Sequence, residues 1–219
     1  MTTKTATKTK AKAQELVIKP PNLQVAEFGI VGVAPLVLNK FNQKAQEMIR
    51  ANQEAGEKGK KNRKREVKDF QAAFQGARHR MKDGSDGIAA PAFRNAMISA
   101  CRVAGFVMSR AKLSVFVLPD GFDVDDGTPL VKITKGKPEY HEAAVRNESG
   151  VIDLRARPMW REGWEAKLRI KFDGDQFSTE DVANLLMRAG AQVGVGEGRP
   201  DSKKSAGMGW GLFEIKGRA

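Results

Sequence analysis

The clearest alternation of apolar and polar residues along the chain covers residues 165–172 (EAKLRIKF). Its apolar members are Ala166, Leu168, Ile170 and Phe172, and its basic members are Lys167, Arg169 and Lys171. Because successive side chains of a strand point to opposite faces of a sheet, this period of two predicts a strand with one buried face and one basic face. The basic face fits a nucleic-acid surface and the solvated side of a sheet equally well.

Three other apolar runs predict buried strands, at residues 23–33, 113–118 and 210–216. The first run is rich in β-branched residues and is interrupted by glycine, which suits a strand better than a helix. Shorter strands are expected within residues 128–157, where the runs LVKIT and VIDLRAR are separated by polar turns.

Residues 88–108 have the spacing of an amphipathic helix, with apolar side chains three and four positions apart. Pro91 fits the first turn of this helix, where a backbone N–H has no partner inside the helix. Two shorter helices are expected at residues 43–55 and 69–82.

A second amphipathic helix is expected at residues 179–189. Ser178 is a suitable N-cap, and Asp181 stands three residues further on, where it can complete a capping box. Gly190 can end this helix because glycine readily adopts the left-handed backbone conformation.

In chain order, these elements form a strand, a helix, two strands, a helix and a final strand. That βαββαβ order predicts an α+β fold with a ferredoxin-like core, the arrangement also found in RNA-recognition (RRM-like) domains. We expect residues 1–20 to form a flexible basic arm and residues 21–219 a single domain. Two insertions are expected within that domain, a basic one at about 42–85 after the first strand and a β-rich one at about 119–160.

The chain of 219 residues contains 38 Lys or Arg and 26 Asp or Glu, a formal net charge of +12. Residues 1–82 hold 18 basic and 7 acidic side chains, whereas residues 83–219 hold 20 and 19. This charge favours polyanionic partners, nucleic acid first and an anionic membrane surface second. No apolar run is long enough to cross a bilayer, and a hydrophobic content of 41% can supply a folded core.

Cys101 is the only cysteine, which argues against a disulfide framework and a cysteine-based zinc site. A lone thiol fits a reducing compartment, and the first residues lack the apolar segment of a secretory signal. We therefore expect a cytoplasmic protein, and the sequence predicts no cofactor.

The sharpest local motif is the glycine-rich stretch VGVGEGRPDSKKSAGMGWGLFEI at residues 193–215. Glycines permit positive φ and close approach of the backbone to a ligand. The neighbouring cations Arg199, Lys203 and Lys204 suit phosphate groups. The motif is not a P-loop, because no glycine directly precedes its lysines. A flexible hairpin whose glycines only serve turns is the alternative.

With its GxGxGxFEI ending, this loop resembles the signature loop of the RAMP superfamily, the repeat-associated RNA-binding proteins of CRISPR systems. The segment DGIAAPAFRNAMISACRVAG (86–105) is similar to the stretch by which Cas7-type backbone subunits enter their first helix. Here Pro91 is displaced and Asn95 stands where glycine is usual. The order of elements over most of residues 23–216 also resembles Cas7-type subunits. A CRISPR subunit and a stand-alone phage or plasmid relative both fit this resemblance.

The resemblance implies a non-catalytic protein that binds single-stranded nucleic acid, RNA favoured over single-stranded DNA, through the sugar–phosphate backbone. It also implies cooperative assembly into a homo-oligomeric filament or ring. By position in the family pattern, the candidate phosphate contacts are Asn39, Lys40, Arg94, Arg199, Lys203 and Lys204. Further candidates from charge, aromatic content and loop position are Lys60, Lys61, Arg63, Arg155, Arg157, Trp160, Arg161, Gly196 and Gly198.

Several alternatives stay open at the level of sequence. Trp160 and Trp164 can stack on bases or anchor a core or subunit interface. The acidic residues Asp120, Asp123, Asp125 and Asp126 could hold Mg²⁺ in a nuclease, although a solvated turn explains them more simply. Some RAMP members cut RNA with an Asp after the first strand, and residues 34–56 contain none.

Two further points complete the sequence-based expectations. His79 and His141 are far apart in the sequence, and neither has an evident partner. A protein–protein subunit or decoy of a RAMP-type complex is a third function class that fits the same resemblance.

Overall fold

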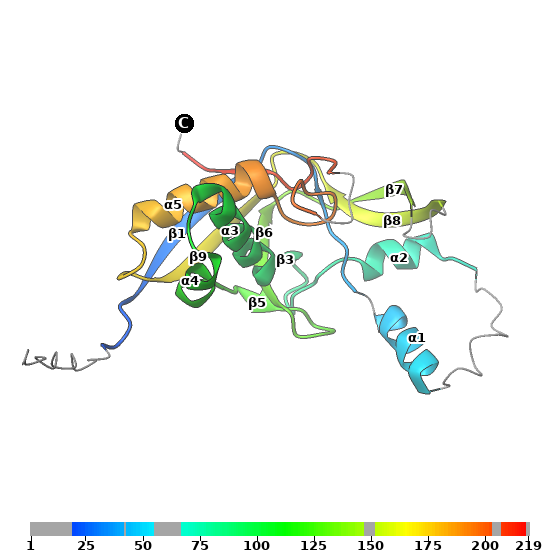
Figure 1. The fold of residues 1–219 in the computed structure, drawn as a ribbon. Helices are drawn as coiled ribbons and strands as arrows, with labels where there is room; N and C mark the ends of the chain where they lie inside the picture. The colour runs from blue at the N-terminus through cyan, green and yellow to red at the C-terminus, as the bar shows by residue number, and fades with distance from the viewer. Residues whose placement is uncertain (1–18, 42, 55–66, 147–151, 203–206, 218–219) are drawn as a thin grey trace, which may run out of the picture.

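The structure, a computed structural model, describes residues 19–41, 43–54, 67–146, 152–202 and 207–217. Most of the basic arm expected at the N-terminus therefore lies outside the described residues. Figure 1 shows a body made of two antiparallel sheets, with helices packed on one side of the larger one.

The larger sheet has seven strands, and its centre is the antiparallel pair β1 (Leu23–Gly32) and β9 (Glu165–Asp173). On the far side of β1 lies β10 (Phe213–Ile215), and two strands share the far side of β9, namely β4 (Val115–Leu118) and β6 (Pro129–Lys135). The short strands β3 (Gly87–Ala89) and β5 (Gly121–Phe122) both pair with β6.

The alternation over residues 165–172 is confirmed as strand β9. Its apolar side chains, Ala166, Leu168, Ile170 and Phe172, are buried and join the main hydrophobic core. The strand expected at 210–216 is confirmed only over Phe213–Ile215, and the strand expected at 113–118 begins at Val115.

Two helices, α3 (Ala90–Ala104) and α5 (Thr179–Arg188), cover one face of the larger sheet (Figure 1). The helix expected at 88–108 is confirmed but ends at Ala104, because Gly105 closes it with a φ of 71°. The chain then enters a separate short helix, α4 (Met108–Ser114), which the sequence pattern did not predict.

The capping box expected at α5 is confirmed. The Ser178 hydroxyl accepts a hydrogen bond from the Asp181 N–H at 3.1 Å, and the Asp181 carboxylate accepts one from the Ser178 N–H at 2.9 Å. Gly190 does not end the helix, because the chain continues as a π-helical turn, η2 (Ala189–Val193). A Cβ at Gly190 would lie 2.1 Å from the Phe213 carbonyl oxygen, so only glycine lets this turn pack on β10.

The smaller sheet has the order β2–β8–β7 and consists of β2 (Leu36–Val37), β8 (Ile152–Trp160) and β7 (Glu139–Arg146). The helix α2 (Phe70–Gly76) lies against β8, as Figure 1 shows, and is shorter than the 69–82 expected. The helix expected at 43–55 is confirmed as α1 (Gln43–Glu54), which stands apart from both sheets in the same view.

Two tryptophans fix the junction of the two sheets. Trp160 and Trp164 are both fully buried, and Trp164 donates its indole N–H to the Ala34 carbonyl at 3.0 Å. A Cβ at Gly32 would lie 1.9 Å from the Trp164 Nε1, so the indole occupies space that only glycine leaves open. Among the described helices, none combines the length and the apolar character that crossing a membrane requires.

Candidate nucleic-acid interface

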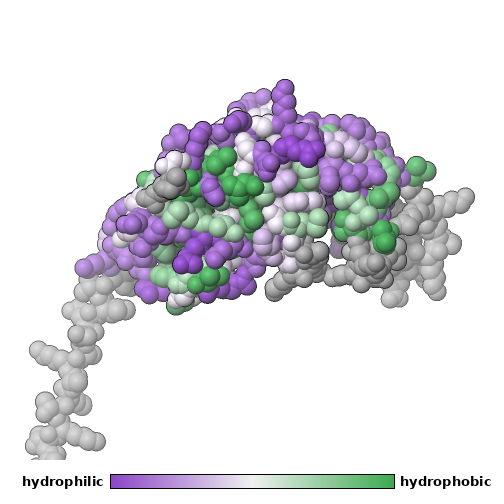
Figure 2. Space-filling model, turned by 90° about the horizontal axis from the view of Figure 1, so that it is seen from above, coloured by the Kyte–Doolittle hydropathy of each residue, from purple (hydrophilic) through white to green (hydrophobic). Residues whose placement is uncertain are grey.

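A cleft of about 750 Å³ separates the smaller sheet from the glycine-rich segment and the start of α3. One wall comes from β7 and β8, the opposite wall from residues 196–202 and 208–210, and the floor from the end of β2 and the β3–α3 junction. We call this space the cleft. Figure 2 shows one face of the molecule, on which hydrophilic residues predominate and hydrophobic ones gather in separate patches.

The alternation of side chains along β7 and β8 determines which residues of these strands line the cleft; we call their side of it the hairpin wall. Ala143 pairs with Arg155 and His141 pairs with Arg157 across β7 and β8, and these four residues line the cleft. Because alternate residues share a face of a strand, both arginines project to the same side. The sequence predicted these two arginines as ligand contacts from composition alone.

The wall formed by residues 196–202 and 207–211, which we call the glycine wall, is held against β2 by backbone hydrogen bonds. The Glu197 N–H donates to the Val37 carbonyl at 2.8 Å, and the Gly211 N–H donates to the Pro35 carbonyl at 2.7 Å. Gly196 has a φ of 81°, and a Cβ there would lie 2.5 Å from the Val37 oxygen. The close approach of the loop to β2 therefore requires glycine at this position.

Six of the candidates predicted from sequence meet in the cleft. They are Asn39, Arg155, Arg157, Gly196, Gly198 and Arg199. Two of their cations already have partners on the glycine wall: Arg157 Nε lies 3.0 Å from Glu197 Oε2, and Arg199 donates to the Gly196 carbonyl at 2.9 Å. Arg155 Nε lies 3.9 Å from Asp153 Oδ2.

Lys40 does not fit the phosphate role expected for it. Its ammonium is 2.5 Å from Asp123 Oδ1 and 2.6 Å from Asp125 Oδ2, and its side chain is 2% exposed. Burial alone would lower the pKa of Lys40, but the hydrogen bonds to the two carboxylates outweigh it and raise that pKa. Lys40 thus neutralises the buried Asp123 carboxylate and pairs with the half-exposed Asp125 beside the cleft instead of facing a ligand.

Arg94 also differs from expectation, because its guanidinium holds the protein together locally. It donates to the backbone carbonyls of Val115 at 2.9 Å and of Lys112, and it lies over the Phe116 ring at 5.3 Å. These contacts tie α3 to the start of β4. Arg94 does not line the cleft.

Trp160 and Arg161 occupy different environments although they are adjacent in sequence. Trp160 is 0% exposed, so the expected stacking of a base on its indole is wrong for this structure. Its indole belongs to the hydrophobic core, and its strand partner is Leu36 of β2 at the junction of the two sheets. Arg161 is exposed, pairs with Glu139 at 2.8 Å and lies outside the cleft.

The five remaining candidates, Lys60, Lys61, Arg63, Lys203 and Lys204, lie outside the described residues. The basic side of β9 is described, and its cations have partners there. Lys167 pairs with Glu27, Arg169 lies 3.3 Å from Asp120, and Lys171 lies over the Phe116 ring at 5.5 Å. These pairs favour the solvated-sheet interpretation of that face.

A buried polar cluster lies next to the cleft and involves His79, which lines it. His79 Nδ1 is 2.9 Å from Asp123 Oδ2, so the histidine has a partner that sequence distance concealed. Burial alone would raise the pKa of Asp123. Hydrogen bonds with Lys40, the Asp125 N–H and His79 outweigh that effect and hold the pKa below its ordinary value of 3.8.

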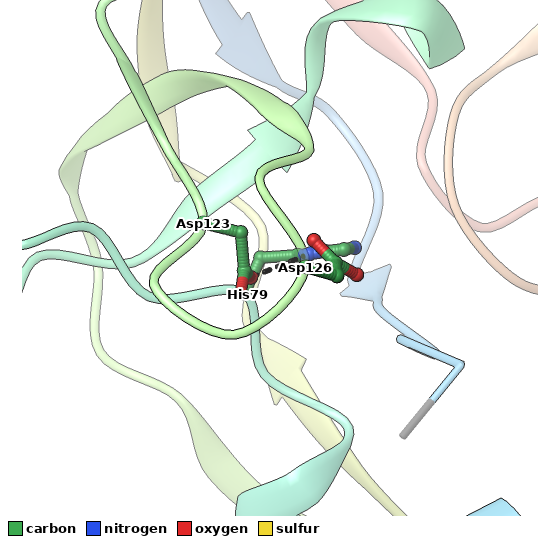
Figure 3. A group of neighbouring side chains, drawn as sticks. All are labelled: His79, Asp123 and Asp126. Atoms are coloured by element: carbon green, nitrogen blue, oxygen red, sulfur yellow. Dashed lines mark hydrogen bonds and ion pairs between the residues drawn. The ribbon is translucent and has the colours of Figure 1, made fainter. Parts of the chain in front are cut away.

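Figure 3 shows His79, Asp123 and Asp126 gathered together. Their nitrogen and carboxylate oxygen atoms lie within 4.8 Å of one another. The donor set suits an ion pair better than a metal ion. Asp123 accepts from Lys40 and the Asp125 N–H on one oxygen, and on the other it contacts His79 and the Arg80 N–H. A metal ion would have to displace the Lys40 ammonium from this carboxylate.

Sequence reasoning missed several residues that line the cleft, namely His79, His141, Glu197, Met208 and Trp210. The period of β7 and β8 could have placed His141 on the same face as the arginines. Trp210 is flanked by glycines and is the one aromatic residue of the glycine-rich motif that precedes β10. No sequence pattern pointed to His79, because its partner Asp123 lies 44 residues away along the chain.

No family model matches the chain, and no curated protein matches it. Among solved structures, the crystal structure of Cmr6 from Pyrococcus furiosus is similar with a TM-score of 0.43 and 11% sequence identity. The match covers 89% of this chain and 98% of that one.

Proposed function

We propose that the protein binds single-stranded nucleic acid, RNA favoured and single-stranded DNA second, by gripping the sugar–phosphate backbone in the cleft. The observation that carries this proposal is the meeting of Arg155, Arg157 and Arg199 from two opposite walls. Guanidinium groups match phosphate oxygens in charge and in hydrogen-bond geometry. The role is binding without catalysis.

The charge balance of the cleft supports this proposal. The described residues that line the cleft include three arginines and one carboxylate, that of Glu197. The net charge of +12 adds long-range attraction for a polyanion. Arg155 and Arg157 stand two residues apart on β8, so a strand running along the hairpin would meet one guanidinium after the other.

We further propose a ferredoxin-like core of the RAMP type for the larger sheet. The strand order β10–β1–β9–β4 supports it, because this is the order in which four strands of a βαββαβ unit pair. α3 connects β1 to β4, and α5 connects β9 to β10. Cooperative homo-oligomeric assembly along the nucleic acid belongs to the same proposal.

The test is the salt dependence of binding to a fluorescently labelled oligouridylate and oligothymidylate. With the three guanidiniums of the cleft as contacts and a slope of about −0.7 per contact for a single strand, affinity should fall by roughly 20-fold or more between 50 and 200 mM salt. Arg155→Gln and Arg199→Gln should each reduce the slope by about one. Lys132→Gln is the matched control, because Lys132 is exposed, pairs with Asp83 and lies outside the cleft. A shallow slope in the wild-type protein would overturn the proposal.

The same experiment separates the alternatives. A protein–protein role in a RAMP-type complex predicts co-purification of protein partners without nucleic acid and no salt-dependent binding to oligonucleotides. A metal-dependent nuclease predicts shortening of the labelled oligonucleotide with Mg²⁺ or Mn²⁺. Asp126→Ala is the better variant for that test, since Asp126 is exposed whereas Asp123 is part of a buried ion pair.

A further inference from the structure

The cleft contains an aromatic side chain beside its arginines. Trp210 lines the cleft together with Met208 and His141. Phosphate binding by the arginines does not account for any of these three side chains. We infer that these residues form a nucleobase subsite, in which the Trp210 indole stacks on one base while the arginines hold the adjoining phosphates. This inference rests on the proposed function and deepens it, because it adds contacts to bases.

Trp210 differs from the other two tryptophans of the chain in its exposure. Trp160 and Trp164 are fully buried, whereas Trp210 is partly exposed and reaches the cleft. An indole presents a large π-face at little cost in side-chain entropy, and bases of every type can stack on it. Among the three tryptophans, only Trp210 can therefore meet a ligand.

The position of Trp210 is fixed before any ligand arrives. A Cβ at Gly198 would lie 2.5 Å from the Trp210 Cε3, so the indole packs closely on the glycine backbone. The backbone N–H of Trp210 donates to the Gly198 carbonyl at 3.3 Å. The His141 and Trp210 rings are nearly perpendicular, with 5.5 Å between ring centroids and an angle of 86°. A preorganised ring loses little freedom on binding.

His141 supplies a second observation that points to a ligand. Its Nε2 atom is buried and has no hydrogen-bond partner among the described residues. A buried polar nitrogen without a partner costs free energy, and such atoms are uncommon in native proteins. The rim of a nucleobase carries both donors and acceptors. A base stacked on Trp210 would lie next to His141 and could complete this hydrogen bond.

The combination of groups selects the class of ligand. Arginines alone would suit any polyanion, and an aromatic side chain alone would suit many apolar groups. A nucleotide joins a flat heterocycle to a phosphate, and the cleft places an indole and three guanidiniums around about 750 Å³. An acidic peptide could pair with the arginines, but only one with an aromatic side chain beside its acidic residues would also offer a flat ring to Trp210, whereas every nucleotide joins the two groups.

The experiment uses the full chain and two probes of the same sugar and length. One is oligouridylate or oligothymidylate, whichever binds more tightly, and the other is an abasic sugar–phosphate oligomer. Because Trp160 and Trp164 are buried, quenching of tryptophan fluorescence by the base-containing probe would report mainly on Trp210. We expect that probe to quench the fluorescence and the abasic probe to bind without quenching.

Two variants test the subsite directly. Trp210→Leu should weaken binding of the base-containing probe by roughly 10-fold, while leaving the affinity of the abasic probe unchanged. His141→Ala should weaken the base-containing probe selectively as well. Phe122→Leu is the control, since Phe122 is an exposed aromatic residue on β5 outside the cleft. Thermal unfolding of each variant checks that it folds.

The outcomes separate this inference from the proposal on which it rests. The base subsite would be overturned, and backbone binding left intact, by three results together. Both probes would bind with equal, salt-dependent affinity, neither would quench the fluorescence, and Trp210→Leu would have no effect. Failure of both probes to bind would overturn both. Retained quenching in Trp210→Leu would also contradict the subsite, because the signal would then come from another tryptophan.

Discussion

Arg157 Nε lies 3.0 Å from Oε2 of Glu197, and this ion pair joins β8 to the glycine wall across the cleft. Both side chains are mostly buried, and a phosphate bound by Arg157 would lie close to the Glu197 carboxylate. The pair therefore holds the two walls together and also opposes an anionic ligand. This relationship gives the first prediction.

Glu197→Gln should increase affinity for single-stranded oligonucleotides by about two- to fivefold at low salt, since it removes a negative charge next to Arg157. The gain should shrink as salt is raised. Glu139→Gln is the matched control, because Glu139 pairs with an arginine, Arg161, outside the cleft. Equal affinities of the wild type and Glu197→Gln, measured by fluorescence anisotropy at low salt, would contradict the prediction.

Lys40→Met should lower the free energy of unfolding by about 3–5 kcal/mol, because it leaves the Asp123 carboxylate buried without its cation. Urea denaturation measures this change. Lys167→Met breaks the exposed pair with Glu27 and should cost about 1 kcal/mol or less. If Lys40 were instead a phosphate contact, its replacement would reduce oligonucleotide affinity with little change in the unfolding midpoint.

The stability that Asp123 contributes should disappear in acid. Its pKa is lowered in the folded protein, so its contribution is complete above the unfolded-state pKa of about 4 and is lost as the pH falls through the lowered folded-state value. The difference in unfolding free energy between wild type and Asp123→Asn should therefore narrow below pH ~4. Asp126→Asn, on an exposed residue of the same loop, controls for the loss of one charge. A gap that stays constant down to pH ~2 would contradict this assignment.

Gly196→Ala should destabilise the protein more than Gly209→Ala. Both glycines have positive φ, 81° and 75°, so the backbone strain is similar. A Cβ at Gly209 would meet nothing within 4 Å, whereas one at Gly196 would lie 2.5 Å from the Val37 oxygen. We expect an extra loss of about 1–3 kcal/mol at Gly196, visible in thermal unfolding, with weaker oligonucleotide binding. Equal melting temperatures would show that the loop does not depend on this close approach.

The sequence predicted those parts of the fold that local periodicity controls. The two-residue period located β9, and the Ser178–Asp181 pair located the start of α5. The pattern could not predict α4, whose seven residues are too short for a period to emerge. It also could not predict the π-helical turn at Gly190, which depends on packing against Phe213.

The candidate site was predictable only in part, for a physical reason. Arg155 and Arg157 were selected from the local clustering of cations and tryptophans alone, and the structure places both on one face of β8. Lys40 was assigned wrongly because its partner Asp123 lies 83 residues further along the chain. Trp160 was selected because it lies among arginines, and Trp210 was passed over although glycines flank it. Only the packing of the two sheets decides which indole is buried.

The close contacts of the glycine wall restrict how the cleft can change over evolution. A side chain at Gly196 would meet the Val37 oxygen, and one at Gly211 would meet the Val195 oxygen at 1.7 Å, so neither of these two positions tolerates a side chain. The opposite wall presents side chains rather than glycine backbone, among them Ala143 and Arg155 on the neighbouring strands β7 and β8. Mutations that alter ligand preference should therefore accumulate on β7 and β8, and a library aimed at new specificity would best be built there.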